Sequence, residues 1–433
     1  MSDTSTTSNQ NTPSPPSAQP PASSAPPSPS APPQAQQSQS GQAGTTATFP
    51  MPQSQAAQPP QSQSQSAQPQ QTSSYTMTEA MNYFVTGTFN KNVADYQGYA
   101  NRKTGYKTLD REQPFYPGLY CLGAISSLGK TTYAGQMADQ LAAAGHWVLY
   151  FSLEQTPFEL FSKSLARGFR RTNMVMAMNQ HKPVDSFFSP SSIEIRRGVG
   201  AGYQRLLDQQ IANYIQAVGN RMCVIHGAFS MTVEDIGYVT KKATEQIRMM
   251  PGAAPNEKPV VIIDYLQIIA PTLINGRVPD TRTSVDHIIH TLKAMQSAED
   301  LTVFVISSLN RQNYLTPIDF ESFKESGMIE YSCDVLMGLQ LSILDSEAFY
   351  YVQEDNNKRP RETSLKEKRE MINKAKSTPP RNIDLVCLKN RYGTSSFKLQ
   401  FEYYPQYDYF RPYFDKGDPD EFAPDIVPTC IYQ

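Results

Sequence analysis

The N-terminal part of this chain is nearly devoid of charge, since Asp3 is the only charged side chain before Glu79. It consists mainly of Ser, Thr, Gln, Pro and Ala, so it cannot bury enough surface to offset the entropy of ordering. We therefore expect residues 1–75 to form a disordered tail, most simply a solubilising tether. The stretch lacks the basic residues of a phosphate-binding arm and the charged start and apolar block of a secretory signal.

Other features are also missing. No apolar run reaches about 18 residues, which excludes a membrane-spanning helix and a membrane partner. The cysteines lie far apart without zinc spacing, and the five histidines form no metal pattern. This cysteine usage suits a reduced, cytoplasmic location. The net charge of −2 supplies no basic surplus, but a few loop contacts in a ring can suffice for DNA. The cysteines are Cys121, Cys223, Cys333, Cys387 and Cys430.

The residues after the tail have globular composition, and their pattern predicts an α/β fold. Apolar runs typical of buried strands alternate with segments of helical periodicity, which predicts a mostly parallel, covered sheet. A pair of strands that meet at a turn over residues 391–393 predicts an antiparallel C-terminal edge. The expected strands are 118–123, 148–151, 222–226, 260–264, 301–307, 335–341, 383–388 and 396–401, and the expected helices are 130–144, 233–249 and 285–298.

These patterns divide the chain into four segments: a tail at 1–75, a helical lead-in at 76–103, an α/β domain at 104–412 and an extension at 413–433. Two stretches interrupt the domain's pattern and are expected to be surface insertions. Residues 170–200 show little periodicity. Residues 355–380 are dense in charge, which favours a solvated helix over a DNA clamp.

The segment Ala124–Thr131, with the sequence AISSLGKT, is the strongest functional signal. It follows the P-loop pattern G-x-x-x-x-G-K-[ST], with Ala124 at the first glycine's place, and it lies between a predicted strand and a predicted helix. Loop N–H groups at a helix start can cradle phosphates, Lys130 can reach the β- and γ-phosphates, and the Thr131 hydroxyl can hold Mg²⁺. The predicted nucleotide contacts are Ala124, Ser126, Ser127, Gly129, Lys130, Thr131 and Thr132.

Two acidic residues complete the predicted site for ATP and Mg²⁺. Asp264 ends the apolar strand at 260–264, which puts its carboxylate at the carboxyl edge of the sheet beside the phosphates, where it suits a role toward Mg²⁺. The alternative is an ordinary strand-end cap. Glu154 follows the strand after the P-loop helix and can orient the water that attacks the γ-phosphate.

Several motifs in order resemble the C-terminal motor domain of DnaB-type replicative helicases. The resemblance runs from about Thr104 to Phe410. It implies a RecA-like P-loop ATPase domain that acts on single-stranded DNA, in a homohexameric ring. The motifs are TGY at 104–106, LD at 109–110, PGL at 117–119, the P-loop, FSLE at 151–154, IDYLQ at 263–267, FKESGMIE at 323–330 and KNRYG at 389–393.

The resemblance also implies roles for matching residues. Glu154 corresponds to the catalytic base, and Lys389 and Arg391 to the pair that reaches the γ-phosphate of a neighbouring subunit. A guanidinium at a hairpin tip can neutralise charge that develops on phosphoryl oxygens. The third group, Lys324, Glu325 and Gly327, matches the central loop that follows the DNA backbone, where lysine and loop N–H groups can meet phosphates.

The chain departs from the family pattern in two places. Ser308 stands where the family has a glutamine that senses the γ-phosphate, and serine is too short to reach equally far. The helical N-terminal domain used for assembly and primase contact is replaced by the tail and lead-in, which favours a mobile-element role over chromosomal replication. We predict a DNA helicase or translocase that hydrolyses ATP. The alternatives are a DNA-dependent ATPase that loads or remodels without unwinding, and a non-catalytic assembly protein that uses ATP to hold a ring.

Overall fold

The computed structural model describes residues 102–227, 230–254, 256–310, 314–323, 327–352 and 361–414, with scattered positions at 81–99, 416 and 418. The chain divides into two units, Met1–Ser73 and Ser74–Gln433, and every described residue belongs to the second. The predicted tail, half of the lead-in and most of the 413–433 extension therefore lie outside the described residues. Within the lead-in, one π-helical turn is described at Phe84–Phe89.

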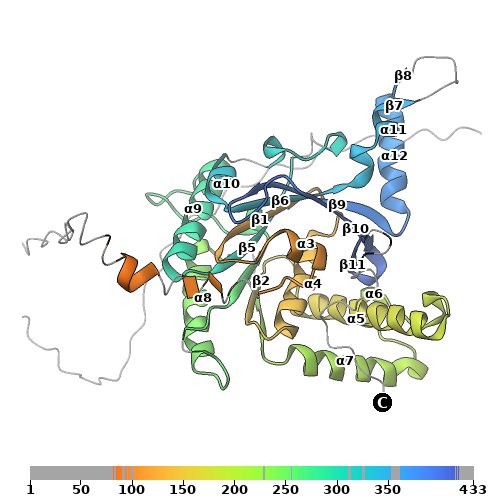
Figure 1. Ribbon diagram of the computed structural model, residues 1–433, viewed down its shortest axis with the longest axis horizontal. Helices are drawn as coiled ribbons and strands as arrows, with labels where there is room; N and C mark the ends of the chain where they lie inside the picture. Colours follow the sequence, from red (N-terminus) through yellow and green to blue (C-terminus); the bar gives the residue numbers. More distant parts are fainter. Residues whose placement is uncertain are drawn as a thin grey trace, which may run out of the picture. The chain divides into compact units, whose positions relative to one another are not determined.

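A nine-stranded sheet in the order β11-β10-β9-β6-β1-β5-β4-β2-β3 forms the centre of the fold (Figure 1). Neighbouring strands from β6 to β3 run parallel, whereas β9, β10 and β11 pair antiparallel at the other edge. This confirms the predicted α/β fold with a mostly parallel sheet. The strands are β1 Gly118–Ala124, β2 Val148–Ser152, β3 Met222–His226, β4 Val260–Asp264, β5 Thr302–Ser308, β6 Val335–Leu341, β9 Arg381–Asn390, β10 Lys398–Tyr404 and β11 Tyr409–Pro412.

Helices cover the sheet, with α8 and α9 on one side and α4, α5 and α7 on the other (Figure 1). Strands β1, β2 and β4 are buried along their whole length, which explains their unbroken apolar sequence. The helices are α3 Lys107–Glu112, α4 Lys130–Ala143, α5 Pro157–Gln180, α6 Ser192–Arg197, α7 Gln204–Val218, α8 Val233–Arg248, α9 Thr281–Glu299, α10 Gly327–Ser332, α11 Glu347–Tyr350 and α12 Leu365–Ser377.

Local capping explains where several helices begin. The Thr156 side chain accepts the Glu159 N–H and the Glu159 carboxylate accepts the Thr156 N–H, so a capping box starts α5 at Pro157. The Asp280 side chain accepts the Thr283 N–H and starts α9 at Thr281, four residues before the predicted start at Val285. The capping hydrogen bond sets the start of the helix, whereas the prediction relied on apolar periodicity alone.

The stretch 170–200 has more helix than its weak periodicity suggested. Helix α5 continues to Gln180, and α6 follows at Ser192. These helices and α7 enclose a small apolar cluster apart from the main core, which contains Leu165, Phe169, Ile195 and Leu207. The pattern was hard to recognise because buried polar residues on α5, such as Arg170 and Asn173, interrupt it.

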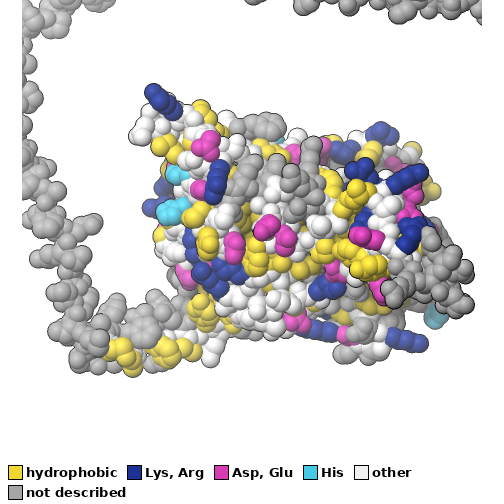
Figure 2. Space-filling model, turned by 90° about the horizontal axis from the view of Figure 1, so that it is seen from above, with side chains coloured by type: hydrophobic (Ala, Val, Ile, Leu, Met, Phe, Trp, Pro, Cys, Tyr) yellow, Lys and Arg dark blue, Asp and Glu magenta, His cyan; other side chains and the backbone are white. Residues whose placement is uncertain are grey.

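The described part of the charged stretch, residues 361–380, contains the helix α12, as the favoured interpretation predicted. A capping box of Ser364 and Glu367 starts α12, and Ile372 is its buried residue, on a helix that packs against β9. A two-stranded hairpin, β7 Tyr351–Val352 and β8 Arg361–Glu362, precedes α12. On the face shown in Figure 2, basic and acidic side chains are interspersed with apolar ones, which agrees with the near-neutral net charge.

Candidate functional site

The P-loop runs from the end of β1 to the first turn of α4. Ser127 and Gly129 have φ angles of 69° and 86°, so the backbone turns left-handed twice within it. Such turns point successive N–H groups into one concave surface that suits an anion. A Cβ at Gly129 would also lie 2.8 Å from the rings of Tyr403 and Phe410, which explains why only glycine fits this position.

Lys130 lies at the start of α4, over the end of β1. Its Nζ donates to the Ala124 carbonyl oxygen at 2.8 Å, which leaves two N–H donors of the ammonium available. Burial lowers the pKa of Lys130, while the negative charges of Asp264 and Glu154 raise it. An anion in the loop therefore meets a cation that is partly desolvated and interacts strongly.

Asp264 is 2 % exposed at the end of β4, where Ser152 of β2 lies beside it. The Tyr150 hydroxyl donates to Asp264 Oδ2 at 3.0 Å. Burial raises the pKa of Asp264, and hydrogen bonds from the side chains of Thr131 and Tyr150 oppose that shift. The hydrogen bond to Thr131 places Asp264 beside the first turn of α4.

Glu154 follows β2 and is exposed. Its charge acts on Lys130, Asp264 and Tyr265, which places it at the same sheet edge. The fold thus brings together four predicted residues from three segments, because parallel strands end at a common edge. A hydroxyl and a carboxylate beside a phosphate-sized cradle form the oxygen-rich set that Mg²⁺ takes together with a nucleotide.

Arg381, at the start of β9, contacts the P-loop and was not predicted. Its guanidinium Nη1 donates to the Ser127 carbonyl oxygen at 2.8 Å, and the group lies 5.7 Å from the centre of the Tyr403 ring. Nothing in the local sequence marks this arginine, because it lies 254 residues from Ser127.

Ser308, at the end of β5, lies beside a glutamine from the turn that follows β4. Its N–H donates to Gln267 Oε1 at 3.0 Å, and Gln267 Nε2 donates to Ser307 Oγ at 2.9 Å. Gln267 belongs to the single 3₁₀ turn Leu266–Ile268 that follows β4. An amide thus lies at the end of β5, although Ser308 does not supply it.

Lys389 and Arg391 lie at the opposite edge of the sheet. Lys389 is paired with Leu336 at the start of β6, and Arg391 Nη1 donates to Asp334 Oδ1 at 3.0 Å. The Asp334 backbone N–H in turn donates to the carbonyl oxygen of Leu119, at the start of β1. At about 3.3 Å per residue, β1 separates that point from Ala124 by roughly 17 Å. Arg391 therefore lies far from the P-loop of its own chain.

The predicted DNA loop is described only in part. Gly327 is the first residue of α10 and an exposed position, whereas Lys324 and Glu325 lie outside the described residues. Before them, Leu309 and Phe323 form an isolated antiparallel bridge. A Cβ at Gly123 would lie 2.6 Å from both of these side chains, so the base of the loop packs directly on β1 beside the P-loop. In the part of the chain that the structure describes, no helix is long and apolar enough to cross a membrane.

The sheet order, the strand–loop–helix cradle and the acidic strand end define a RecA-like P-loop ATPase domain. The family model of the DnaB-like helicase C-terminal domain matches residues 102–411, and the chain therefore belongs to this family. A search of curated proteins found no significant match.

Two solved structures are similar to the described fold. One is an isolated ATPase domain, which aligns with a TM-score of 0.53 and 19 % identity over 78 % of this chain and 99 % of that one. The other is a DnaB-like replicative helicase, described with its interactions with primase, which aligns with a TM-score of 0.52 and 18 % identity. That alignment covers 76 % of this chain and 66 % of the helicase, so this chain matches slightly under two thirds of the helicase's length.

Proposed function

We propose that this chain is the motor of a DNA helicase or translocase, which hydrolyses ATP at sites between subunits of a homohexameric ring. The observation that carries the proposal is the placement of its cations. Lys130 lies at the P-loop edge, whereas Lys389 and Arg391 lie at the opposite edge and cannot reach the same nucleotide. A cation pair on the far edge is explained if it serves the P-loop of a neighbouring copy.

In the chain's own half of the site, the P-loop binds the phosphates of ATP. Lys130 neutralises the β- and γ-phosphates, and the N–H groups around Ala124, Ser126, Ser127, Gly129 and Thr132 surround them. Thr131 and Asp264 hold Mg²⁺, which supplies positive charge to the phosphoryl oxygens when it is bound. Glu154 is the base that orients and deprotonates the attacking water.

The neighbouring copy supplies the second half. Arg391 is 52 % exposed in its side chain, and its hydrogen bond to Asp334 occupies one guanidinium nitrogen. The remaining donors can meet the γ-phosphate across an interface, where they stabilise charge that develops during transfer. Burial and the charge of Arg391 lower the pKa of Lys389, which is expected of a cation pair held close together.

Single-stranded DNA is the proposed track. Lys324, Glu325 and Gly327 form the loop that follows its backbone, with the lysine on a phosphate and the loop N–H groups near Gly327 on another. Membership of the family supports this assignment, and the bridge between Leu309 and Phe323 places the base of the loop beside the P-loop.

One specific observation favours a second function, a DNA-dependent ATPase that loads or remodels without unwinding. Ser308 replaces the glutamine that usually senses the γ-phosphate. The amide at this position then comes from Gln267, which is already hydrogen-bonded to Ser307 and Ser308. An amide held in this way is less free to report hydrolysis to the DNA loop. An ATPase that loads or remodels DNA without unwinding it fits that arrangement.

Three assays separate the functions. ATP hydrolysis is measured with and without single-stranded DNA, and strand displacement is measured on a forked duplex. A motor hydrolyses ATP faster with DNA and displaces the strand, whereas a remodelling ATPase shows the first response without the second. Absence of turnover in both conditions, together with a native mass that rises with ATP and Mg²⁺, would identify an assembly protein and contradict the proposal.

A further inference from the structure

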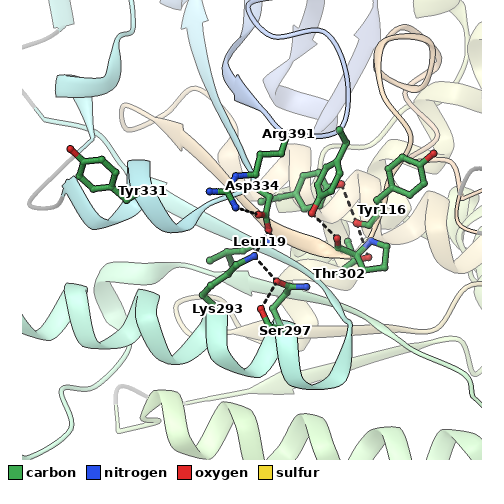
Figure 3. A network of polar contacts seen from close by, with 12 residues as sticks. Tyr116, Leu119, Lys293, Ser297, Thr302, Tyr331, Asp334 and Arg391 are labelled. Atoms are coloured by element: carbon green, nitrogen blue, oxygen red, sulfur yellow. Dashed lines mark hydrogen bonds and ion pairs between the residues drawn. The ribbon is translucent and has the colours of Figure 1, made fainter. Parts of the chain in front are cut away.

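Asp334 is the centre of a polar network at the edge of the sheet that lies opposite the P-loop (Figure 3). Its side chain is 4 % exposed and accepts three hydrogen bonds. Oδ2 accepts the Leu119 N–H at 2.8 Å and the Lys293 ammonium at 2.6 Å, and Oδ1 accepts Arg391 Nη1 at 3.0 Å. One buried carboxylate therefore holds the start of β1, the helix α9 and the arginine at the hairpin tip in register.

The backbone makes the same connection. The Asp334 N–H donates to the Leu119 carbonyl oxygen at 2.8 Å, and the Arg391 N–H donates to the Asp334 carbonyl oxygen at 3.0 Å. Arg391 is thus tied to Asp334 through both its main chain and its side chain. The Arg391 side chain is 52 % exposed, and with Nη1 bonded to Asp334 the orientation of the planar guanidinium is determined by Asp334.

Lys389 is tied to the same short segment. Its ammonium donates to the carbonyl oxygens of Glu330 and Tyr331, at 2.5 and 3.3 Å. These are carbonyls of the last turn of α10, where helical partners are missing and a cation is favourable. Helix α10 begins at Gly327, and Asp334 follows its end, so one segment connects the predicted DNA loop with both cations.

We propose that Asp334 is a positioning residue, which fixes the direction in which Arg391 extends toward the nucleotide of the neighbouring subunit. Because Asp334 follows α10 in the chain, its own position depends on that helix. This inference rests on the proposed action of Arg391 across the interface. Lys293 donates to the other carboxylate oxygen, Oδ2, and holds the carboxylate against α9.

The test uses Asp334→Asn in the full chain, with DNA-stimulated ATP hydrolysis as the readout. Asparagine keeps an oxygen for the Leu119 N–H and loses the charge that holds Arg391. We expect kcat to fall roughly 10- to 100-fold, the scale for a catalytic group misplaced by about 1 Å, while KM for ATP stays within twofold. The matched control is Lys242→Met, which removes an exposed lysine of α8 outside this network and should leave kcat within threefold.

A double-mutant cycle with Arg391→Ala separates the possible outcomes. If Asp334 acts through Arg391, the double variant is as slow as Arg391→Ala alone, within twofold. If the two fold-reductions multiply, Asp334 has a separate structural role and the inference is wrong. If Arg391→Ala hydrolyses ATP at the wild-type rate, the proposed action across the interface fails instead.

A second variant covers a folding defect. Should Asp334→Asn lose its thermal unfolding transition, the readout moves to Asp334→Glu, which retains the charge but carries the carboxylate one methylene further. A lower kcat at unchanged KM supports the positioning role. A wild-type kcat for this variant contradicts it, because the displaced carboxylate would then not matter.

Discussion

The individual residues of the site differ in how their surroundings tune them. Asp264 is buried and has a raised pKa, whereas Glu154, which follows the neighbouring strand β2, is exposed to solvent. Two carboxylates at one edge can therefore perform different tasks, and we propose that Asp264 acts toward the metal and Glu154 toward water. Hydrogen bonds from Tyr150 and Thr131 oppose the rise in the pKa of Asp264 that its burial causes.

The role of Glu154 leads to the first prediction. Glu154→Gln preserves size and removes the base, so ATP should still bind while hydrolysis falls by roughly 10²-fold or more. Nucleotide binding by fluorescence and turnover by phosphate release measure the two effects separately. Glu245→Gln, on an exposed face of α8, is the matched control and should hydrolyse normally. A parallel loss of binding and turnover would mean that Glu154 has a structural role.

A second residue affects stability through pH. Burial lowers the pKa of His146 to about 4, and the charges of Arg102 and Arg221 act in the same direction. The unfolded chain keeps a pKa near 6.5, so it binds the proton first as the pH falls, and stability is lost between about 6.5 and 4. At about 1.4 kcal/mol per pH unit, the loss from pH 7 to pH 5 is at most roughly 2 kcal/mol.

Urea unfolding at the two pH values checks this prediction. His146→Gln should lose less stability on acidification than the wild type, by about that amount. His290→Gln, at an exposed position of α9, should follow the wild type. Equal slopes for the wild type and His146→Gln would show that other groups control the acid response.

Among the elements, β9 has the most consequential placement. It begins with Arg381 on the P-loop and ends beside Lys389 at the opposite edge. At about 3.3 Å per residue, its ten residues span roughly 30 Å. One strand therefore contacts the chain's own nucleotide site at one end and carries the cations proposed for the neighbour's site at the other. A strand flanked on both sides by partners is a stiff connection between the two.

The loop before α10 leads to the third prediction. If Lys324 contacts a phosphate, Lys324→Ala should weaken binding of single-stranded DNA for every sequence and flatten the slope of log K against log salt by about one unit. Lys242→Ala, at an exposed lysine of α8, should leave the slope unchanged. Titrations at four salt concentrations measure both. An unchanged slope for Lys324→Ala would place the DNA contact elsewhere.

At the scale of the whole molecule, the proposed ring makes each active site a product of two copies. Arg391→Ala protein should then bind ATP and hydrolyse it poorly, and Lys130→Ala protein should also be inactive. Mixing the two should restore some hydrolysis, because an intact P-loop from one variant meets an intact arginine from the other at some interfaces. An arginine that acts within its own chain predicts no rescue.

The mixing experiment needs proof of subunit exchange, which native mass spectrometry supplies. If exchange occurs and activity stays at zero, a titration of Arg391→Ala protein into wild type decides between two explanations. A ring that requires every site loses activity much faster than linearly with the inactive fraction. A linear loss combined with failed rescue would show that Arg391 does not act across the interface.

Several features could be predicted because their cause is local. The apolar strands, the βαβ pattern, the P-loop and the acid at Asp264 are encoded in short stretches whose periodicity or residue order has one physical meaning. The antiparallel pair β9 and β10 was predictable from two runs and a turn between them. Helices α5 and α6 were harder to predict because buried polar side chains disturb their periodicity.

The sequence by itself determined the fold class and the identity of the phosphate-binding loop, since a strand, a glycine-containing turn and a helix succeed one another without interruption. Only the tertiary structure decided which distant groups meet. Asp334 lies 215 residues from the Leu119 N–H that it accepts, and Arg381 lies 254 residues from Ser127. Such contacts depend on the order in which strands pair, and strand order is decided by packing of the whole sheet and not by any local pattern.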